Sequence, residues 1–304
     1  MSIQVSYLSL FEIGHRSNQE DCIYPKINGS LKNNDLFIIC DGMGGHDDGE
    51  VASQTVCNTL SSYILTRPEA DLDSALNAAY NALDKRDYNG EGEMGTTLAL
   101  VKFEESHCIV AHIGDSRVYQ IRPSEKKLVF VTKDHSLINS LIECGELSPE
   151  EAKSFPQKNV ITRAMQPNQE NRAKADVAVL TDIREGDYFY MCSDGMLENI
   201  DDEEIINIIS KTISDREKMS VLKNLTKDNK DNHSAHLIRV ISNNKNSFAT
   251  NAAKTPILKK YVWILLAVAV ILGILCIITK RPTKMTIKTN ELDSTSIVNS
   301  SNPN

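Results

Sequence analysis

The 304-residue chain lacks several features that would place it outside the cell or on nucleic acid. It has no Cys-x-x-Cys pair, and its seven cysteines are an odd number, which favours a reducing compartment over a disulfide framework. Residues 1–11 contain no Lys or Arg, so they do not resemble a secretory signal. Acidic residues also outnumber basic ones, with 41 Asp and Glu against 33 Lys and Arg, so the net charge is −8. This acidic balance argues against a nucleic-acid partner.

Charge divides the chain into two parts. Residues 1–241 hold 25 Lys and Arg against 39 Asp and Glu, a balance of −14, whereas the remainder holds 8 against 2, a balance of +6. An acidic domain is expected where carboxylates collect metal ions. The basic remainder suits a membrane surface with anionic lipids.

The acidic residues that stand out belong to five short motifs spread over more than two hundred positions. Carboxylates brought together from distant points repel one another, so a fold that keeps such a cluster needs divalent cations to neutralise it. Clusters of oxygen ligands alone suit hard ions such as Mg²⁺ or Mn²⁺. The motifs are Arg16-Ser17-Asn18-Gln19-Glu20-Asp21, Asp41-Gly42-Met43-Gly44-Gly45-His46, Gly114-Asp115-Ser116-Arg117, Ser193-Asp194-Gly195 and Asp231-Asn232.

Two of these motifs follow hydrophobic runs. Residues 36–40 lead into Asp41-Gly42, and residues 188–192 lead into the motif of Asp194, so both runs are predicted to be buried strands that end in turns. Each strand would present a carboxylate at the rim of a sheet. Gly42 has no Cβ, so its carbonyl could approach an ion closely. A single Asp-Gly dipeptide is more often only a turn signal, but five motifs together favour a site.

The ordered set of motifs, extended by Gly95-Thr96-Thr97 and Asp134-His135-Ser136, resembles the PPM/PP2C family of metal-dependent protein serine/threonine phosphatases in its bacterial form. The resemblance covers about residues 3–241. It implies an α+β fold, a sandwich of two antiparallel sheets flanked by helices. Separate blocks of predicted strands and helices agree with α+β rather than with alternating βαβ units.

The resemblance also implies a metal site with two ions of Mn²⁺ or Mg²⁺ and, as in many bacterial relatives, a weaker third. Asp41 would bridge two ions, the Gly42 carbonyl would bind one of them, and Asp194 and Asp231 would complete the other. The implied metal-binding residues are Glu20, Asp21, Asp41, Gly42, Asp115, Asp194 and Asp231.

The remaining roles follow from the same resemblance. Glu20 would act through metal-bound water with Asp21 beside it, and Asp115 would bind the third ion together with Asp194. Arg16 would hold the substrate phosphate with its planar fork, and Arg16 and Asp41 are the expected catalytic residues. An isolated Arg would more often form a surface salt bridge, but this one lies within the matched motif.

The general acid is left unassigned by the sequence. Met43 stands where some eukaryotic relatives place a His that is taken to protonate the leaving alcohol. His46 is close in sequence, but at a Gly-Gly turn it is more often a turn or helix-start residue than a catalyst. Metal-bound water could do the same work.

Residues 133–165 are predicted to form a substrate flap, because they are polar and show little alternation. The pattern Ser148-Pro149-Glu150-Glu151 predicts a short helix that starts near Pro149. His135 is open to two interpretations, as a strand-end hydrogen bonder or as a catalytic residue. Further strands are predicted at 96–103, 107–113, 118–121, 127–131 and 235–241, and helices at 50–65, 71–87 and 202–213, with Ser214 capping another helix and Glu217 completing the cap.

Beyond the domain, residues 261–279 are 19 consecutive uncharged and mostly apolar positions. At about 1.5 Å per residue this length can cross a hydrocarbon core of about 30 Å. We therefore expect a phosphatase domain over 1–241, a flexible linker over 242–258, a transmembrane helix with basic flanks over 259–281 and a disordered tail over 282–304. A buried core helix is the weaker alternative, because such helices usually keep a polar face.

The expected function is hydrolysis of phosphoserine and phosphothreonine in proteins by a metal-activated water. We expect the protein to oppose a Ser/Thr kinase at a bacterial inner membrane, with the catalytic domain in the cytoplasm. A phosphoprotein-binding pseudophosphatase would have lost metal carboxylates, and none is missing from the motifs. A small-molecule phosphatase remains open, because the flap that selects the leaving alcohol is the least readable region. An HD-type phosphohydrolase is disfavoured, because the seven His residues lack the required helical spacing.

Overall fold

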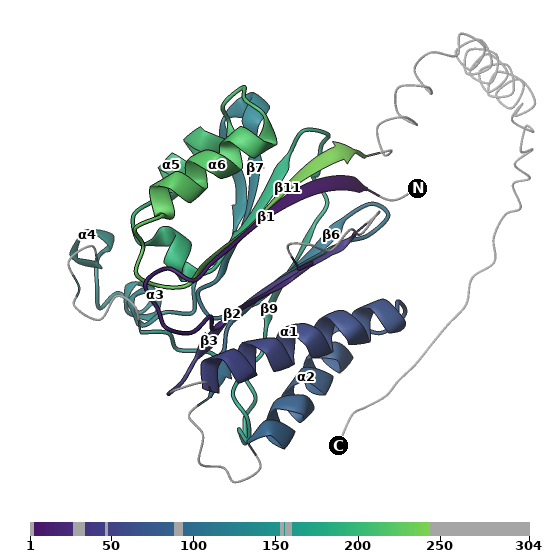
Figure 1. The fold of residues 1–304 in the computed structure, drawn as a ribbon, viewed down its shortest axis with the longest axis vertical. Coiled ribbons are helices and arrows are strands. Elements are labelled where there is room, and N and C mark those ends of the chain that lie inside the picture. The colour runs from purple at the N-terminus through teal and green to yellow at the C-terminus, as the bar shows by residue number, and fades with distance from the viewer. Residues whose placement is uncertain are drawn as a thin grey trace, which may run out of the picture. The chain divides into compact units, whose positions relative to one another are not determined.

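The computed structural model describes residues 3–26, 34–45, 48–87, 94–152, 155 and 160–243. They belong to one compact unit that spans Met1–Ser247 (Figure 1). The predicted transmembrane span over 261–279 and the tail lie outside the described residues. Within the described part of the chain, no helix is both long and apolar enough to cross a membrane.

Two antiparallel sheets form the centre of the unit. Sheet A has the order β1 (Gln4–Glu12), β11 (His233–Ser242), β10 (Tyr188–Cys192), β7 (Arg117–Arg122) and β8 (Lys127–Val131). Sheet B has the order β2 (Asp21–Tyr24), β3 (Leu36–Met43), β5 (Leu98–Phe103), β6 (Cys108–Ile113) and β9 (Asp176–Leu180), and β4 (Gly95–Thr96) pairs with β3. This confirms the predicted α+β sandwich.

The inner faces of the two sheets bury a shared aromatic and aliphatic core. Phe37 and Phe103 of sheet B meet Phe189 and Ile238 of sheet A in one cluster. The rings of Phe103 and Phe189 pack edge to face with centroids 5.0 Å apart, a favoured geometry for aromatic pairs. The two sheets are therefore joined by close side-chain packing.

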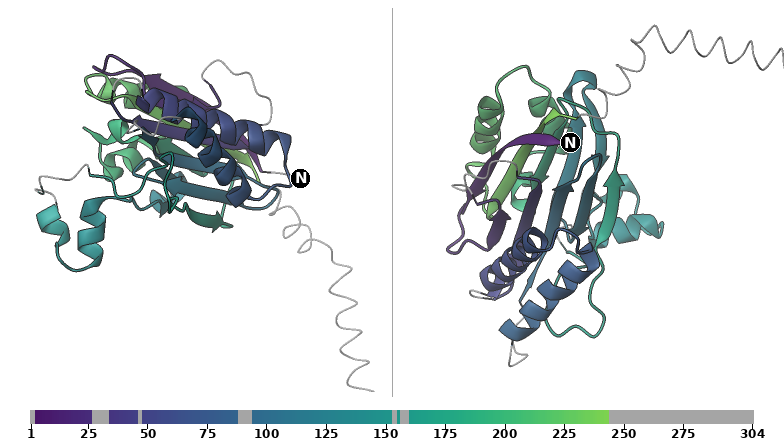
Figure 2. Two further views of the ribbon diagram at one scale, coloured as in Figure 1. Left: turned by 90° about the horizontal axis from the view of Figure 1, so that it is seen from below. Right: turned by 90° about the vertical axis from the view of Figure 1, so that its right-hand side faces the viewer.

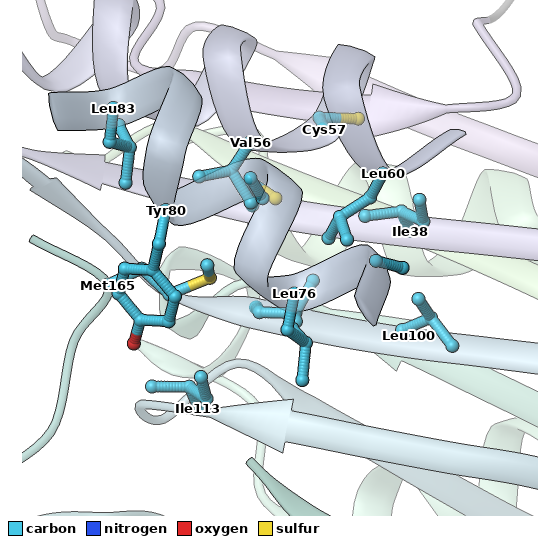
Figure 3. Close-up of a cluster of buried hydrophobic side chains, with 14 of the residues drawn as sticks. Ile38, Val56, Cys57, Leu60, Leu76, Tyr80, Leu83, Leu100, Ile113 and Met165 are labelled. Atoms are coloured by element: carbon cyan, nitrogen blue, oxygen red, sulfur yellow. The ribbon is translucent and has the colours of Figure 1, made fainter. Parts of the chain in front are cut away.

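Helices cover the outer face of each sheet (Figures 1 and 2). α1 (Asp48–Thr66) and α2 (Leu72–Arg86) lie on sheet B, where Val56, Leu60 and Leu76 cover Ile38 and other strand residues (Figure 3). Leu60 is fully buried, so truncating it to Ala would cost about 2–5 kcal/mol of stability. α2 begins one residue after its predicted start, and the side chain of Asp71, the residue before it, caps the helix by accepting from the Ser74 amide.

α5 (Asp202–Ile209) and α6 (Asp215–Thr226) lie on sheet A. The prediction that the first of these helices continues to residue 213 is wrong, because it ends at Ile209. Ser210 and Lys211 close the last turn, and the chain then turns so that Ser214 can cap α6. Ile213 lies in this turn and is exposed. The predicted capping box of Ser214 and Glu217 is confirmed.

The segment predicted to form the flap contains two short helices. α4 (Pro149–Ala152) is the helix that the sequence predicts. α3 (Leu137–Glu143) is an addition, and the Ser136 side chain caps it by accepting from the Asn139 amide. The single strand predicted over 96–103 is divided at Thr97 between β4 and β5.

The strand register brings the acidic motifs to one end of the sandwich. Leu98 pairs with Ile113, so the end of β6 lies beside the end of β3. In sheet A, Cys192 pairs with both Ala235 and Arg117. Turns that leave β3, β6 and β10 and the turn that enters β11 therefore meet at this end.

Candidate metal centre

The backbone around Asp41 is fixed by two threonines. The Asp41 amide donates to Thr97 Oγ1 at 3.0 Å, and the Asp41 carbonyl accepts from the Thr97 amide at 2.8 Å and from Thr96 Oγ1 at 2.9 Å. Gly42 follows, and a Cβ there would lie 2.1 Å from the Gly49 carbonyl oxygen at the start of α1. The close approach of helix and strand thus requires glycine at this position.

Asp21 is buried, with 2% of the residue exposed. Its Oδ2 accepts from Ser193 Oγ at 2.9 Å and from Ser234 Oγ at 2.6 Å, while Oδ1 has no hydrogen-bond partner among the described residues. Burial raises the pKa of Asp21 to about 7. A buried carboxylate oxygen without a hydrogen-bond partner costs free energy. A bound cation, or a water molecule attached to such a cation, would give Oδ1 a partner.

Asn232 holds the loop that carries Glu20. Its Oδ1 accepts from the Glu20 amide at 2.7 Å, and its Nδ2 donates to the carbonyls of Ile13 and Asn18 at 2.8 and 3.0 Å. The sequence motif contains Asn232, but no positioning role was predicted for it.

The remaining carboxylates come from three other turns. Asp194 is the first residue of η2 (Asp194–Leu197), which follows β10. Asp231 precedes β11, and the Glu198 carboxylate accepts from its amide at 2.9 Å. Asp115 lies in the turn between β6 and β7.

Seven of the eight predicted site residues line one pocket of about 360 Å³. The eighth, Asp21, lines a neighbouring cavity of about 500 Å³. The structure therefore brings the predicted set together. The 360 Å³ pocket is lined by Arg16, Glu20, Asp41, Gly42, Asp115, Asp194 and Asp231, and in addition by Met43, Gly44, Thr97 and Ile161.

Burial and mutual repulsion raise the pKa values of three carboxylic acids at this site. Burial, followed by repulsion from Asp21 and Asp194, raises the pKa of Asp41 well above its usual range. Burial and the Asp194 charge raise the pKa of Asp115 to about 7. Burial also raises the pKa of Asp194. The cluster offers only oxygen ligands, and its carboxylates ionise with difficulty. Such a site fits hard divalent cations, because a bound cation would stabilise the charged carboxylates.

Arg16 stands at the rim of the pocket. Its Nη2 donates to Asp231 Oδ2 at 2.7 Å, and 53% of its side chain is exposed. The hydrogen bond to Asp231 raises the pKa of the guanidinium. The structure thus places Arg16 beside the carboxylates, where the predicted phosphate contact is sterically open.

Comparison with known proteins identifies the family. The family model for protein phosphatase 2C matches residues 18–237, which is more than half of the chain. The chain belongs to the protein phosphatase 2C family.

Two curated 2C-family relatives illustrate the similarity. The chain is 32% identical over 225 residues to the protein phosphatase PhpP of Streptococcus pneumoniae, covering 70% of this chain and 87% of that protein. It is 35% identical over 201 residues to the serine/threonine protein phosphatase PstP of Mycobacterium tuberculosis. That match covers 64% of this chain but only 36% of the mycobacterial protein, so the chain spans about a third of that relative.

Solved 2C-type structures share the fold. The crystal structure of the M. tuberculosis phosphatase PstP superposes with a TM-score of 0.68 at 30% identity, covering 80% of this chain and 100% of that one. A crystal structure of the PstP catalytic domain in complex with two manganese ions gives a TM-score of 0.65 at 29% identity and covers 80% of this chain and 100% of that one.

Met43 lines the pocket, but its side chain is not titratable. His46, the other residue considered for proton transfer, lies outside the described residues. The general acid is thus not supplied by Met43.

A second group of possible metal ligands was not predicted from the sequence. His112, His135 and Asp176 each offer a ligand atom, and these atoms lie within 4.8 Å of one another. Asp176 is the cross-strand partner of His112, so strand pairing rather than a sequence motif brings them together. These residues are not among those that line the acidic pocket.

Proposed function

We propose that the described domain catalyses metal-dependent hydrolysis of phosphoserine and phosphothreonine in proteins. The observation that carries this proposal is the single pocket on which Arg16 and carboxylates from five separate segments converge. Membership of the 2C family and the names of the relatives, which are serine/threonine phosphatases, support it.

The residues of the pocket fit a centre for Mn²⁺ or Mg²⁺. Asp41, Asp194, Asp231 and the Gly42 carbonyl would hold two ions, and Asp115 with Asp194 would hold a third. Glu20 and Asp21 would act through water. When bound, such cations lower the pKa of a shared water molecule and polarise the phosphoryl oxygens for in-line attack.

Hydrogen bonds within the chain position the carboxylates of the site. Thr96 and Thr97 fix the Asp41 backbone, and Ser193 and Ser234 orient Asp21. These contacts limit the reorganisation needed at the site. The Arg16 guanidinium keeps N–H groups beyond the one that binds Asp231, and these would bind two phosphate oxygens.

An assay with the full-length protein tests the activity. It should release phosphate from a phosphothreonine peptide in Mn²⁺ and stop in EDTA, with activity returning when Mn²⁺ is added in excess. Hydrolysis that continues in EDTA would contradict the metal mechanism. A matched assay with a small phosphate ester separates a protein phosphatase from a small-molecule phosphatase, because the latter would prefer the ester.

The cellular setting is a further part of the proposal. Residues 261–279 would anchor the protein through membrane lipid in a bacterial inner membrane, with the catalytic domain in the cytoplasm. The uncharged 19-residue run and its basic flanks support this. A domain tethered there would act on membrane-proximal phosphoproteins, among them a Ser/Thr kinase and its targets.

A further inference from the structure

The turn that carries Asp115 is held at both ends by two consecutive residues, Asp134 and His135. At one end, Arg117 Nε and Nη2 donate to the two Asp134 carboxylate oxygens at 2.7 and 2.6 Å. At the other end, the His135 amide donates to the Gly114 carbonyl at 2.9 Å. Between them, Ser116 Oγ lies 2.7 Å from Thr97 Oγ1.

The His135 ring makes a further contact to the same turn. The Gly114 amide donates to His135 Nδ1 at 3.1 Å, so Nδ1 must carry a lone pair. The ring proton is therefore on Nε2, which lies 3.2 Å from Asp176 Oδ2. Asp176 thus stabilises the tautomer of His135 that can accept from Gly114.

A metal ion held by His112, His135 and Asp176 is a poorer explanation of this cluster. Binding through His135 Nε2 would move the ring proton to Nδ1, where it would face the Gly114 N–H. Arg163 Nη1 also lies 3.2 Å from His135 Nε2 and 2.9 Å from Asp176 Oδ1. The Arg163 guanidinium therefore already supplies a positive charge where a metal ion would bind. His112 stacks on His135 with centroids 4.5 Å apart and reaches the Lys133 carbonyl at 2.8 Å.

We propose that His135 is a positioning residue that holds the Gly114–Arg117 turn so that the Asp115 carboxylate faces the acidic pocket, and that Asp176 fixes the His135 tautomer needed for this. The proposal rests on the proposed function, because it takes Asp115 as a ligand of the third ion. His135 acts through a backbone amide, and neither it nor Asp176 lines the pocket.

Binding of Mn²⁺ to the full-length, EDTA-stripped protein tests the proposal by titration calorimetry. The site lost in Asp115→Ala identifies the Asp115-dependent ion. His135→Ala should weaken this site by about 10-fold and leave the tighter sites unchanged, as outer-sphere substitutions do in other metal proteins. His107→Ala, in the turn before β6, is the matched control and should bind Mn²⁺ as the wild type does.

Two further variants separate positioning from a general structural role. His135→Asn places an oxygen where Nδ1 stood, so it should restore the site, whereas His135→Gln should not. Asp176→Ala should weaken the site in the wild type but have no further effect in His135→Asn, because an amide has no tautomer to fix. These variants also carry the test should His135→Ala fail to fold.

Several results would overturn the proposal. They are unchanged Mn²⁺ binding in His135→Ala, equal losses in His135→Ala and His135→Asn, or the absence of any Asp115-dependent site in the wild type. Normal Mn²⁺ binding without hydrolysis of the phosphothreonine peptide would instead reject the proposed function and leave the positioning role intact.

Discussion

At the scale of single residues, Arg16 lines the acidic pocket, and we propose that it binds the substrate phosphate there. Its guanidinium binds Asp231 through one nitrogen and is otherwise half exposed. Replacing Arg16 by Ala should lower kcat/KM by about 10- to 100-fold, since a charge-assisted hydrogen bond contributes about 1.5–3 kcal/mol. Most of the loss should appear in KM.

Steady-state kinetics on a phosphothreonine peptide provides the measurement, and Arg16→Lys is the control. Lys keeps the charge but loses the fork, so it should recover only part of the loss. An Arg16→Ala enzyme with the wild-type KM would show that the phosphate is bound elsewhere.

Asp194 tests the assignment of the carboxylates. Asp194→Ala removes a group that we assign to both the main centre and the third ion, so turnover should fall to background in Mn²⁺. Its melting temperature in EDTA should not fall, because one repelling charge leaves a crowded cluster. Asp228→Ala, at a highly exposed position, is the control for both readouts. Near-normal turnover in Asp194→Ala would refute the assignment.

His236 gives the domain a defined acid sensitivity. The side chain is fully buried between the sheets, where Ser9 Oγ lies 2.8 Å from Nδ1 and Nε2 has no partner among the described residues. Burial lowers the pKa of His236 to about 4, below the unfolded value of 6.5. The unfolded state therefore binds more protons, so stability falls as the pH drops from about 6.5 to 4, by about 3 kcal/mol in total.

Urea unfolding between pH 7 and pH 4 measures this effect. His236→Asn keeps an acceptor for Ser9 but cannot titrate, so its stability should fall less steeply over this range. Identical pH slopes for the two proteins would show that His236 is not responsible.

The eight candidate site residues could be selected from the sequence because each lies in a short motif, and the structure places seven of them around one pocket. Their supporting partners could not be selected in this way, because hydrogen bonds between distant segments leave no local pattern. Ser234 binds Asp21 across 213 positions, and Asn232 binds Glu20 across 212. Asn232 lies within a predicted motif and Ser234 lies close to it. This proximity to a motif was the only sign in the sequence that the two residues support the site.

At the scale of elements, helices with strong caps were the most predictable. Ser214 marks the start of α6 as predicted, and the range predicted for α2 differs from the structure by one residue at each end. β9 was missed because it is a short edge strand whose Val177 and Val179 are exposed, so its pattern does not resemble a half-buried strand. The end of α5 was misplaced because the isoleucine run continues beyond the point where the chain must turn.

The capping box of α6 permits a matched comparison. The Ser214 side chain accepts from the Glu217 amide at 3.3 Å, and the Glu217 carboxylate accepts from the Ser214 amide at 2.8 Å. Ser214→Ala should therefore lower the free energy of unfolding by about 1 kcal/mol. Ser220→Ala, on the exposed face of the same helix, should be neutral or slightly stabilising because Ala favours helix. Equal effects in chemical unfolding would argue against the cap.

At the scale of the whole molecule, the proposed anchor predicts a separation of activity from location. Full-length protein should pellet with membranes and resist carbonate extraction, whereas a chain ending at Ser242, where β11 ends, should be soluble and active. A tag at Asn304 should be cleaved by protease added to spheroplasts. A protected tag would reject the proposed orientation, and soluble full-length protein would reject the anchor.

The acidic residues of the pocket belong to both halves of the sandwich. Asp41 lies in β3 of sheet B, whereas Asp194 and Asp231 adjoin strands of sheet A. Cations bound between them would cross-link the two sheets and add about 2.7 kcal/mol to the free energy of unfolding at 100 times their dissociation constant. Metal starvation would then do more than slow catalysis: it would leave a looser chain for cellular proteases, so manganese supply would set the amount of enzyme as well as its rate.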